Sequence, residues 1–299
     1  MSSVDLSALQ RPNDRLRRRR VVNRSMELLA WLTAAIAVAF LGVIVWSVAR
    51  RGAGAVDLDL FTKPQVPYAP AGVEQGLANA FAGSLVIVGI AAAMALPFGI
   101  LVAIYVNEFA PRAIRSGVSL VLDVLNGIPA IVVGFFVYGL IVVGHGQSGL
   151  AASFALAVLM LPLVARSTIE VLALVPASLR EASLGLGVPR WRTTLAIVLP
   201  QTVGGIVTGT TLAVARIAGE TAPLLVTSSL VTNGTSWNPL HALQTVPVAI
   251  FELTESYEPA DHARAWAAAL VLLLFVLFTS FAARWAATRS RRKLARTGR

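Results

Sequence analysis

The chain has 299 residues, of which 56% are hydrophobic and only 13% are charged, and its formal net charge is +10. A soluble domain carries about 25% charged residues, so this composition, with a mean hydropathy of +0.73, excludes an ordinary soluble globular protein. The same apolar content excludes intrinsic disorder. Because the chain contains no cysteine, it has no disulfide framework and no cysteine nucleophile. The composition therefore predicts an integral membrane protein.

Six stretches of the sequence are apolar enough to cross a membrane as helices. A helix rises 1.5 Å per residue, so crossing about 30 Å of hydrocarbon takes roughly 20 apolar residues. We therefore predict an all-α membrane protein with six transmembrane helices. In chain order, the predicted spans are Leu28–Val48, Leu77–Val106, Gly117–Gly144, Gly149–Ala165 continuing to Ser178, Thr193–Ala215 continuing to about Leu230, and Ala265–Ala283.

The first span also has the outline of a cleaved signal peptide, because a basic segment precedes its apolar core. That core is longer than the roughly 7–15 residues of a signal peptide, and further spans follow it. We therefore interpret it as a retained transmembrane helix.

Basic residues gather at both ends of the chain. Lys and Arg next to a span favour the cytoplasmic side. Because six spans place both ends on one side, we predict that both termini are cytoplasmic in a multi-pass protein of the cell (inner or plasma) membrane. The segments predicted to face the cytoplasm are 107–117 and 175–200, and those predicted to face outward are 49–76 and 231–264. Arg50 and Arg51 are exceptions to this charge distribution. Basic tails can also bind nucleic acid, but topogenic charge explains them more simply, and we predict no nucleic-acid partner.

The predicted cytoplasmic segment 175–200 contains a short amphipathic helix. Pro176 can open a helix, and Gly187 suits the left-handed residue that ends one. The apolar residues on one face of this helix are Leu179, Ala182 and Leu186. Such a protruding helix can dock in a groove of a partner protein.

The spacing of residues in this segment is more specific. Glu181, Ala182 and Ser183 are followed after three residues by Gly187, and nine residues later by Ile197-x-Leu199-Pro200. This spacing resembles the EAA loop of ABC importer permeases, whose pattern is Glu-Ala-Ala, three residues, Gly, nine residues and Ile-x-Leu-Pro. Only Ser183 departs from that pattern, and it is another small residue. The resemblance implies a coupling helix that inserts into a cytoplasmic ATPase subunit, whereas the alternative is an interfacial loop helix.

Several polar side chains lie inside predicted spans. A charge in hydrocarbon costs roughly 2.5–3.5 kcal/mol on insertion scales, so such residues face a protein interior or a water-filled path. Arg166 and Glu170 are four residues apart, and so are Arg216 and Glu220. We predict that each pair lies on one helix face and partly neutralises itself. A third set, on one face of the third span, is Asp123 and Asn126.

A path lined by arginine suits an oxyanion, because the guanidinium offers planar, permanently charged donors that match phosphate. A neighbouring glutamate competes for those donors and so prevents a permanent, tight trap. It could also accept a hydrogen bond from a protonated phosphate. The alternative, that these residues are interhelical clamps with no ligand, stays open for both pairs.

Three further motifs are similar to phosphate ABC transporter permeases of the PstA type. They are residues 219–225 (Gly-Glu-Thr-Ala-Pro-Leu-Leu), 125–134 (Leu-Asn-Gly-Ile-Pro-Ala-Ile-Val-Val-Gly) and 246–251 (Val-Pro-Val-Ala-Ile-Phe). Ala130 stands where that family often has serine. The resemblance covers about residues 77–283 and implies the type I ABC importer permease fold. It also implies that Arg216 and Glu220 take part in phosphate passage.

These observations together predict the organisation of the chain. The predicted parts are a basic cytoplasmic tail (1–25), a first transmembrane helix (26–48), an extracytoplasmic segment (49–76), an ABC transmembrane type-1 permease domain (77–283) and a second basic tail (284–299). The predicted substrate pathway comprises Arg216, Glu220, Thr221, Arg166, Glu170, Asp123 and Asn126. The predicted ATPase-coupling loop comprises Glu181, Ala182, Ser183, Gly187, Ile197, Leu199 and Pro200.

The resemblance implies a permease subunit of an ATP-driven importer that moves inorganic phosphate into the cytoplasm by alternating access. The partners it implies are a second homologous permease, two copies of an ABC ATPase, an extracytoplasmic phosphate-binding protein and membrane lipid. The chain itself is predicted to hold no cofactor. Its two lysines, Lys63 and Lys293, lie outside any Gly-x-x-x-x-Gly-Lys-Ser/Thr loop, so a separate subunit would bind ATP. Sulfate or another oxyanion is an alternative substrate on charge grounds.

Two other function classes compete with this interpretation. Residues 146–149 match the Gly-x-Ser-Gly of rhomboid intramembrane proteases, which need a histidine inside a later span. Here the histidines lie outside the predicted spans, and they are His145, His241 and His262. A glycine-rich turn explains the motif without chemistry, so we predict no catalytic residue and no metal site. A passive anion channel is the other class, but it would need no coupling helix.

Overall fold

The computed structural model describes residues 14–66, 75–229 and 234–297. Outside these ranges lie residues 1–13 of the predicted basic tail, residues 67–74 of the predicted outer segment, the predicted end of the fifth span at Leu230, and the last two residues. All regular structure within the described ranges is helical, which confirms the predicted all-α class.

Most of the helices follow one another with short connections, and the longer intervals fall between α2 and α3 and between α11 and α12. In chain order they are α1 (Asp14–Gly52), the 3₁₀ turn η2 (Ala53–Ala55), α2 (Leu58–Thr62), α3 (Ala78–Ile104), the π-helical turn η3 (Tyr105–Phe109), α4 (Arg112–Gly127), α5 (Ala130–Val137), the π-helical turn η4 (Tyr138–Val142), α6 (Val143–His145), α7 (Gly149–Ala173), α8 (Ala177–Gly185), α9 (Arg190–Thr193), the π-helical turn η5 (Thr194–Val198), α10 (Leu199–Ala218), α11 (Ala222–Thr227), α12 (Val246–Thr254) and α13 (Pro259–Thr297).

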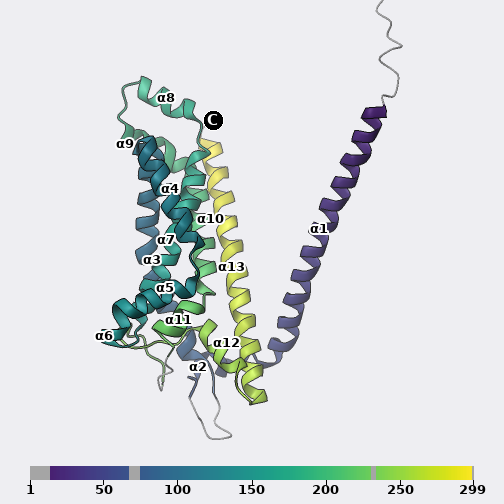
Figure 1. The fold of residues 1–299 in the computed structure, drawn as a ribbon, viewed down its shortest axis with the longest axis vertical. Helices are drawn as coiled ribbons and strands as arrows, with labels where there is room; N and C mark the ends of the chain where they lie inside the picture. The colour runs from purple at the N-terminus through teal and green to yellow at the C-terminus, as the bar shows by residue number, and fades with distance from the viewer. Residues whose placement is uncertain (1–13, 67–74, 230–233, 298–299) are drawn as a thin grey trace, which may run out of the picture. The chain divides into compact units, whose positions relative to one another are not determined.

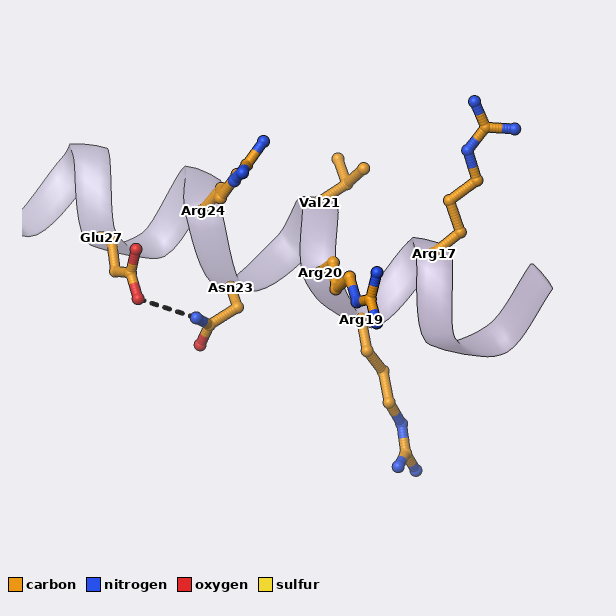
Figure 2. A pocket seen from close by; sticks show the side chains of 7 residues that line it. All are labelled: Arg17, Arg19, Arg20, Val21, Asn23, Arg24 and Glu27. Carbon is orange, nitrogen blue, oxygen red and sulfur yellow. Dashed lines mark hydrogen bonds between the residues drawn. The ribbon is translucent and has the colours of Figure 1, made fainter. Parts of the chain in front are cut away.

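The chain divides into two compact parts, residues 1–50 and residues 51–299. The first part contains most of α1, which begins at Asp14, inside the predicted tail of residues 1–25. Arginine side chains project from several sides of its first turns, where the Asn23 side-chain amide donates a hydrogen bond to the Glu27 carboxylate at 2.8 Å (Figure 2). The helix continues without a break into an apolar stretch long enough to span a membrane. Arginines just before such a stretch are typical of the cytoplasmic end of a span.

Five described helical stretches are long and apolar enough to cross a membrane, and a sixth candidate is a bent pair. The bent pair corresponds to the predicted third span, Gly117–Gly144, which is therefore a broken span rather than a straight helix. The axis turns by 94° between α4 and the helical stretch Ala130–His145. Pro129 has no N–H to continue the helix, and it holds the preceding Ile128 in an extended conformation (φ −70°, ψ 128°).

The second part has two different ends (Figure 1). Helices α8 and α9 lie at one end, here named the α8 end, and the short helices α5, α6, α11 and α12 lie toward the opposite end, here named the α12 end. Between them, α3 and α7 pack closely through alanines and the fully buried Leu156 and Met160. The long helices therefore act as a scaffold that holds different short helices at its two ends.

Helix α10 lies against α7 through glycines. A Cβ on Gly205 would lie 2.5 Å from a methyl group of Val171, and one on Gly209 would lie 2.8 Å from the Ser167 hydroxyl oxygen. The two helices therefore approach closely at these glycines, as in other membrane helix pairs with small residues at the interface.

Arg51, an exception to the predicted charge distribution, stacks on an aromatic ring. Its guanidinium carbon lies 4.8 Å from the centroid of the Trp266 ring near the start of α13. Gly52 lies directly beside the Trp266 carbonyl oxygen, where a Cβ would be only 2.5 Å away. The cation–π contact partly compensates the charge at this position.

Two glycines of α3 provide a matched test of this packing. A Cβ on Gly83 would lie 2.0 Å from the backbone carbonyl oxygen of Gln244, whereas a Cβ on Gly89 would meet nothing within 4 Å. We expect Gly83→Ala to lower the free energy of unfolding by roughly 1–3 kcal/mol, because the backbone must move. Gly89→Ala should leave it unchanged or slightly raised, because alanine favours helix. Thermal unfolding of the purified protein measures both, and equal midpoints for the two variants would contradict the described contact.

Candidate functional site

Helix α8 has the boundaries that the coupling-loop pattern predicts. Pro176 precedes its first residue, and Gly187 adopts a positive φ of 79° just beyond its end. The N–H of Val188 donates to the Ser183 carbonyl at 3.2 Å, and the N–H of Gly187 donates to the Leu184 carbonyl at 2.9 Å. These two bonds form a Schellman motif, in which a left-handed glycine lets the last carbonyls of the helix be satisfied. The predicted conformation of Gly187 is confirmed.

One face of α8 points away from the rest of the described chain. Leu186 is 84% exposed and Leu179 is 40% exposed, and Glu181 and Ala182 are also exposed. The helix lies at one extreme of the second part (Figure 1). An amphipathic helix whose apolar side chains are exposed at the end of a bundle has the form of a docking element.

Ser183, the residue that departs from the family pattern, is buried. Its hydroxyl lies 2.8 Å from the hydroxyl of Thr193 on α9, and both side chains are buried. This hydrogen bond ties α8 to the helix that follows it, so a serine here is satisfied although it is buried.

The remaining residues of the predicted coupling pattern lie in the next long helix. Ile197 is in the π-helical turn η5, and Leu199 and Pro200 follow at the start of α10. Because Pro200 has no N–H, it cannot donate to the carbonyl four residues earlier, and the helix widens in the turn just before it. The structure therefore separates the pattern into an exposed part on α8 and a part within a candidate span.

A contact that the sequence analysis missed joins α8 to the end of α3. The Arg180 guanidinium makes two hydrogen bonds, at 3.0 and 2.8 Å, to the two carboxylate oxygens of Glu108 in η3. The two residues are 72 positions apart, so no local spacing links them. The only available signal was that an acidic residue and a basic residue occupy two segments predicted to lie on the same side.

Arg166 lies between two carboxylates near the α8 end of α7. Its Nη2 is 3.3 Å from Asp123 Oδ1 on α4, and its Nε is 3.9 Å from Glu170 Oε1 on its own helix. The predicted pairing with Glu170 is therefore present, but the shorter contact is to Asp123. Asn126 is exposed one turn further along α4. Because charges exposed to lipid are costly, this face of the chain is expected to meet water or another protein surface.

Arg216 and Glu220 do not share a helix face, so the predicted pairing is wrong. Helix α10 ends at Ala218, and the N–H of Glu220 donates to the Ile217 carbonyl in a tight final turn. No ion pair within 4.0 Å joins the two residues, both of which belong to the described ranges. Gly219 closes this turn, and the proline-containing first turn of α11 then redirects the chain. Arg216 is exposed, whereas Glu220 and Thr221 are partly buried.

The serine of the protease-like motif has a structural role. Ser148 is the N-cap of α7, and its hydroxyl accepts a hydrogen bond from the Ala151 N–H at 3.2 Å. Gly146 before it has a φ of 82°, which glycine adopts readily. Among the described residues, no group of three His, Asp or Glu side chains is arranged to hold a metal ion. A helix cap therefore accounts for the motif.

A polar network lies near the α12 end. The Asn79 side-chain amide donates to Gln244 Oε1 at 2.9 Å, and Gln244 Nε2 donates to Glu252 Oε2 at 2.7 Å. Glu252 belongs to α12, which is not among the candidate spans. Burial raises the pKa of the Glu252 carboxyl above its ordinary value of 4.5, the hydrogen bond from Gln244 lowers it, and the nearby Glu255 raises it again.

The sequence of this chain matches known membrane transport proteins. Residues 95–292 match the family described as "Binding-protein-dependent transport system inner membrane component". The chain is 40% identical over 268 residues to the phosphate transport system permease protein PstA of Yersinia pestis, covering 89% of this chain and 90% of that protein. It is 36% identical over 282 residues to the phosphate transport system permease protein PstA 1 of Mycobacterium tuberculosis, covering 92% and 91% of the two chains.

Solved structures share its fold. A bacterial alginate ABC transporter, in complex with its alginate-bound periplasmic protein, matches with a TM-score of 0.63 and 16% identity over 91% of this chain and 97% of that chain. The methionine ABC transporter MetNI in an inward-facing conformation matches with a TM-score of 0.56 and 19% identity over 71% and 93%.

The helical bundle and the family match define a multi-pass inner-membrane component of a binding-protein-dependent transport system rather than an enzyme, and its fold is that of the ABC transporter membrane subunits above. The chain belongs to the family of binding-protein-dependent transport system inner membrane components, and within it to the PstA permeases.

Glu252 should make the stability of the protein depend on pH. Because its pKa is raised in the folded state, the folded state binds the proton more tightly than the unfolded state does, so stability falls as the pH rises above the unfolded value. We expect Glu252→Gln to unfold at a higher temperature than the parent at pH 7 and at a similar temperature at pH 4. Thermal unfolding at both pH values measures this, with the exposed Glu258→Gln as control. A Glu252→Gln variant that is less stable at pH 7 would contradict the assignment.

Proposed function

We propose that this chain is one membrane subunit of an ATP-driven importer of inorganic phosphate that works by alternating access. The substrate proposal rests on the relatives in Yersinia pestis and Mycobacterium tuberculosis, which are named phosphate transport permeases. The polar residues in the candidate spans agree with it, because guanidinium groups bind phosphate oxygens in a geometry that few other side chains match.

The single observation that carries the coupling proposal is the exposed face of α8. Its leucines are uncovered in this chain, and the Schellman motif at Gly187 gives the helix a defined end. A partner that covers this face would bury apolar area and stabilise the complex. We therefore infer that an ABC ATPase subunit, which binds ATP in place of this chain, takes α8 into a groove.

The arrangement of basic residues supports a cytoplasmic position for the α8 end and for both termini. Exposed arginines surround this end, at Arg112, Arg190 and Arg192, and the C-terminal end of α13 lies beside it (Figure 1). Arginine-rich turns also precede the apolar stretch of α1. Excess Lys and Arg is the usual mark of the cytoplasmic side.

The number of coupling helices points to a second permease. This chain has one segment that matches the coupling pattern, whereas a pair of ATPases needs two docking helices. We infer that a second, homologous permease supplies the other one. An extracytoplasmic phosphate-binding protein would deliver substrate to the α12 end.

The proposed pathway places charged groups at two depths. At 1.5 Å per residue, Arg216 lies roughly 25 Å along α10 from its start at the α8 end. Arg166 lies only about 10 Å from the end of α7 at that same end. An anion that moves toward the cytoplasm would therefore meet Arg216, Glu220 and Thr221 first. It would then reach Arg166 with its neighbours Glu170, Asp123 and Asn126.

One alternative substrate and one alternative function class each have a separate test. Sulfate or another oxyanion satisfies the same charge pattern, and competition between sulfate and labelled phosphate for uptake distinguishes them. A passive anion channel would conduct without the ATPase, so uptake by vesicles that lack the ATPase partner would favour that class.

Arg216→Ala should reduce phosphate uptake while the transporter still assembles. Loss of a charge-assisted contact to an anion is worth about 1.5–3 kcal/mol, so we expect uptake to fall at least roughly tenfold. Uptake of labelled phosphate by cells that carry the variant measures this, and co-purification of the partner subunits reports assembly. Arg112→Ala is the matched control, because Arg112 lies at the exposed start of α4 outside the proposed pathway. Normal uptake by Arg216→Ala would remove Arg216 from the pathway.

Gly187→Val should uncouple ATP hydrolysis from uptake. A side chain at Gly187 would have open space, but a left-handed conformation costs an L-residue roughly 1–2 kcal/mol. The end of α8 would therefore distort without any steric clash. Gly187→Asn should retain most of the coupling, because asparagine tolerates this conformation. The measured quantity is phosphate imported per ATP hydrolysed, and equal ratios for the two variants would argue against the role of α8.

A further inference from the structure

One arginine joins α8 to the ends of two candidate spans. A guanidinium has five N–H donors, and the Arg180 guanidinium makes four hydrogen bonds here. Two go from Nε and Nη2 to the carboxylate of Glu108, and two go from Nη2 and Nη1 to the backbone carbonyls of Leu172 and Val175, at 2.9 and 2.6 Å. Glu108 lies in η3, which continues α3, and Leu172 lies in the last turn of α7. We call this set of contacts the Arg180 clamp.

The Arg180 clamp is well shielded from solvent. The Glu108 side chain is 7% exposed and the Arg180 side chain is 22% exposed. Charge-assisted, two-pronged contacts of this kind are about twice as strong as neutral hydrogen bonds, and they fix orientation as well as distance. The Leu172 carbonyl lies in the last turn of α7 and also accepts from the Val175 N–H at 3.3 Å. The clamp therefore adds a charge-assisted bond at a helix end while it holds α8.

Two further contacts make the clamp part of a larger rigid group. Below it, Ala103, Leu172, Val175 and Val198 form a buried apolar cluster that connects α3, α7 and η5. Three residues after Arg180, Ser183 bonds to Thr193 of α9. Helix α8 is therefore held at two points, one to α3 and α7 and the other to α9.

We propose that Arg180 is the positioning residue that transmits movement of α8 to α3 and α7, and that the Arg180 clamp stays closed throughout the transport cycle. This proposal rests on the proposed coupling role of α8. A docking helix on a flexible loop would move with its partner without moving the spans. The clamp makes α8, the end of α7 and the end of α3 move as one body, because the same guanidinium holds all three.

The variant Arg180→Lys tests this proposal in the assembled transporter. Lysine keeps the charge and can still reach one partner, but its single ammonium lacks the planar fork needed to hold a carboxylate and two carbonyls at once. We expect the complex to assemble and to hydrolyse ATP, while the phosphate imported per ATP hydrolysed falls roughly tenfold, as for loss of hydrogen bonds from a charged group. Glu108→Gln, which changes the acceptor of the same contact, should also lower the phosphate imported per ATP hydrolysed.

Arg115→Lys is the matched control. Arg115 also donates hydrogen bonds to η3, at the carbonyls of Val106 and Asn107, but no bond from it to α8 is present in the described part of the chain. We expect its ratio of uptake to hydrolysis to stay at the parental value. An equal drop in Arg115→Lys would show that the α8 end loosens in general, and it would overturn the specific role of Arg180.

A cross-link tests whether the clamp stays closed. The chain has no cysteine, so the double variant Glu108→Cys/Arg180→Cys can be joined by a short bifunctional thiosulfonate in the purified complex. We expect low coupling before cross-linking and partial recovery after it. No recovery, or a complex that hydrolyses ATP without import after cross-linking, would overturn the proposal. Failure of the proposed function is distinguishable, because the parental complex itself would then show no ATP-dependent phosphate uptake.

Discussion

The hydrocarbon of a bilayer offers no hydrogen-bond partners, so the chain must satisfy its own polar groups there. Thr202 and Thr210 do so locally, because their hydroxyls donate to carbonyls one turn earlier in α10. Ser148 and Arg180 do so at the two ends of α7, where a helix leaves backbone groups unpaired. Arg216 is exposed in a candidate span, and because a charge in lipid is costly, we infer that a ligand or a partner subunit meets it.

The same constraint explains why the two ends of the bundle differ. At the α8 end, few but strong contacts hold one exposed helix, and apolar side chains are left uncovered for a partner. At the α12 end, the chain turns several times in short helices that fill the space between the long ones. Helix α5 approaches α11 so closely that a Cβ on Gly134 would lie 2.7 Å from the Pro223 backbone. Packed interfaces of this kind switch between discrete arrangements rather than deform continuously.

Local signals in the sequence predicted the bounds of α8 well, but they did not predict contacts between residues far apart in the chain. Pro176 and Gly187 bound α8 through backbone properties of proline and glycine themselves, so their roles needed no knowledge of the fold. The i,i+4 rule predicted the Arg166–Glu170 contact, but it assumes a continuous helix, and the same rule failed for Arg216 because α10 ends two residues later. Pro129 is a residue at which a span can bend, but the 94° angle between the two halves of the third span depends on packing that the sequence does not reveal. The Arg180 clamp joins residues 72 positions apart, a distance at which spacing carries no information.

Ser183 illustrates how a departure from a family pattern becomes understandable once the fold is known. A buried hydroxyl without a partner costs roughly 1–3 kcal/mol, so serine at a buried position normally destabilises a helix that packs there. Here the residue ten positions later, Thr193, supplies a hydroxyl at 2.8 Å. Thr193 can also donate to the Pro189 carbonyl at 3.4 Å. In a chain with alanine at position 183, this threonine would therefore still have a hydrogen-bond partner. Thr193 thus keeps a partner with or without serine at position 183, whereas Ser183 beside an apolar residue at 193 would have to turn to a carbonyl of its own helix, as Thr202 and Thr210 do.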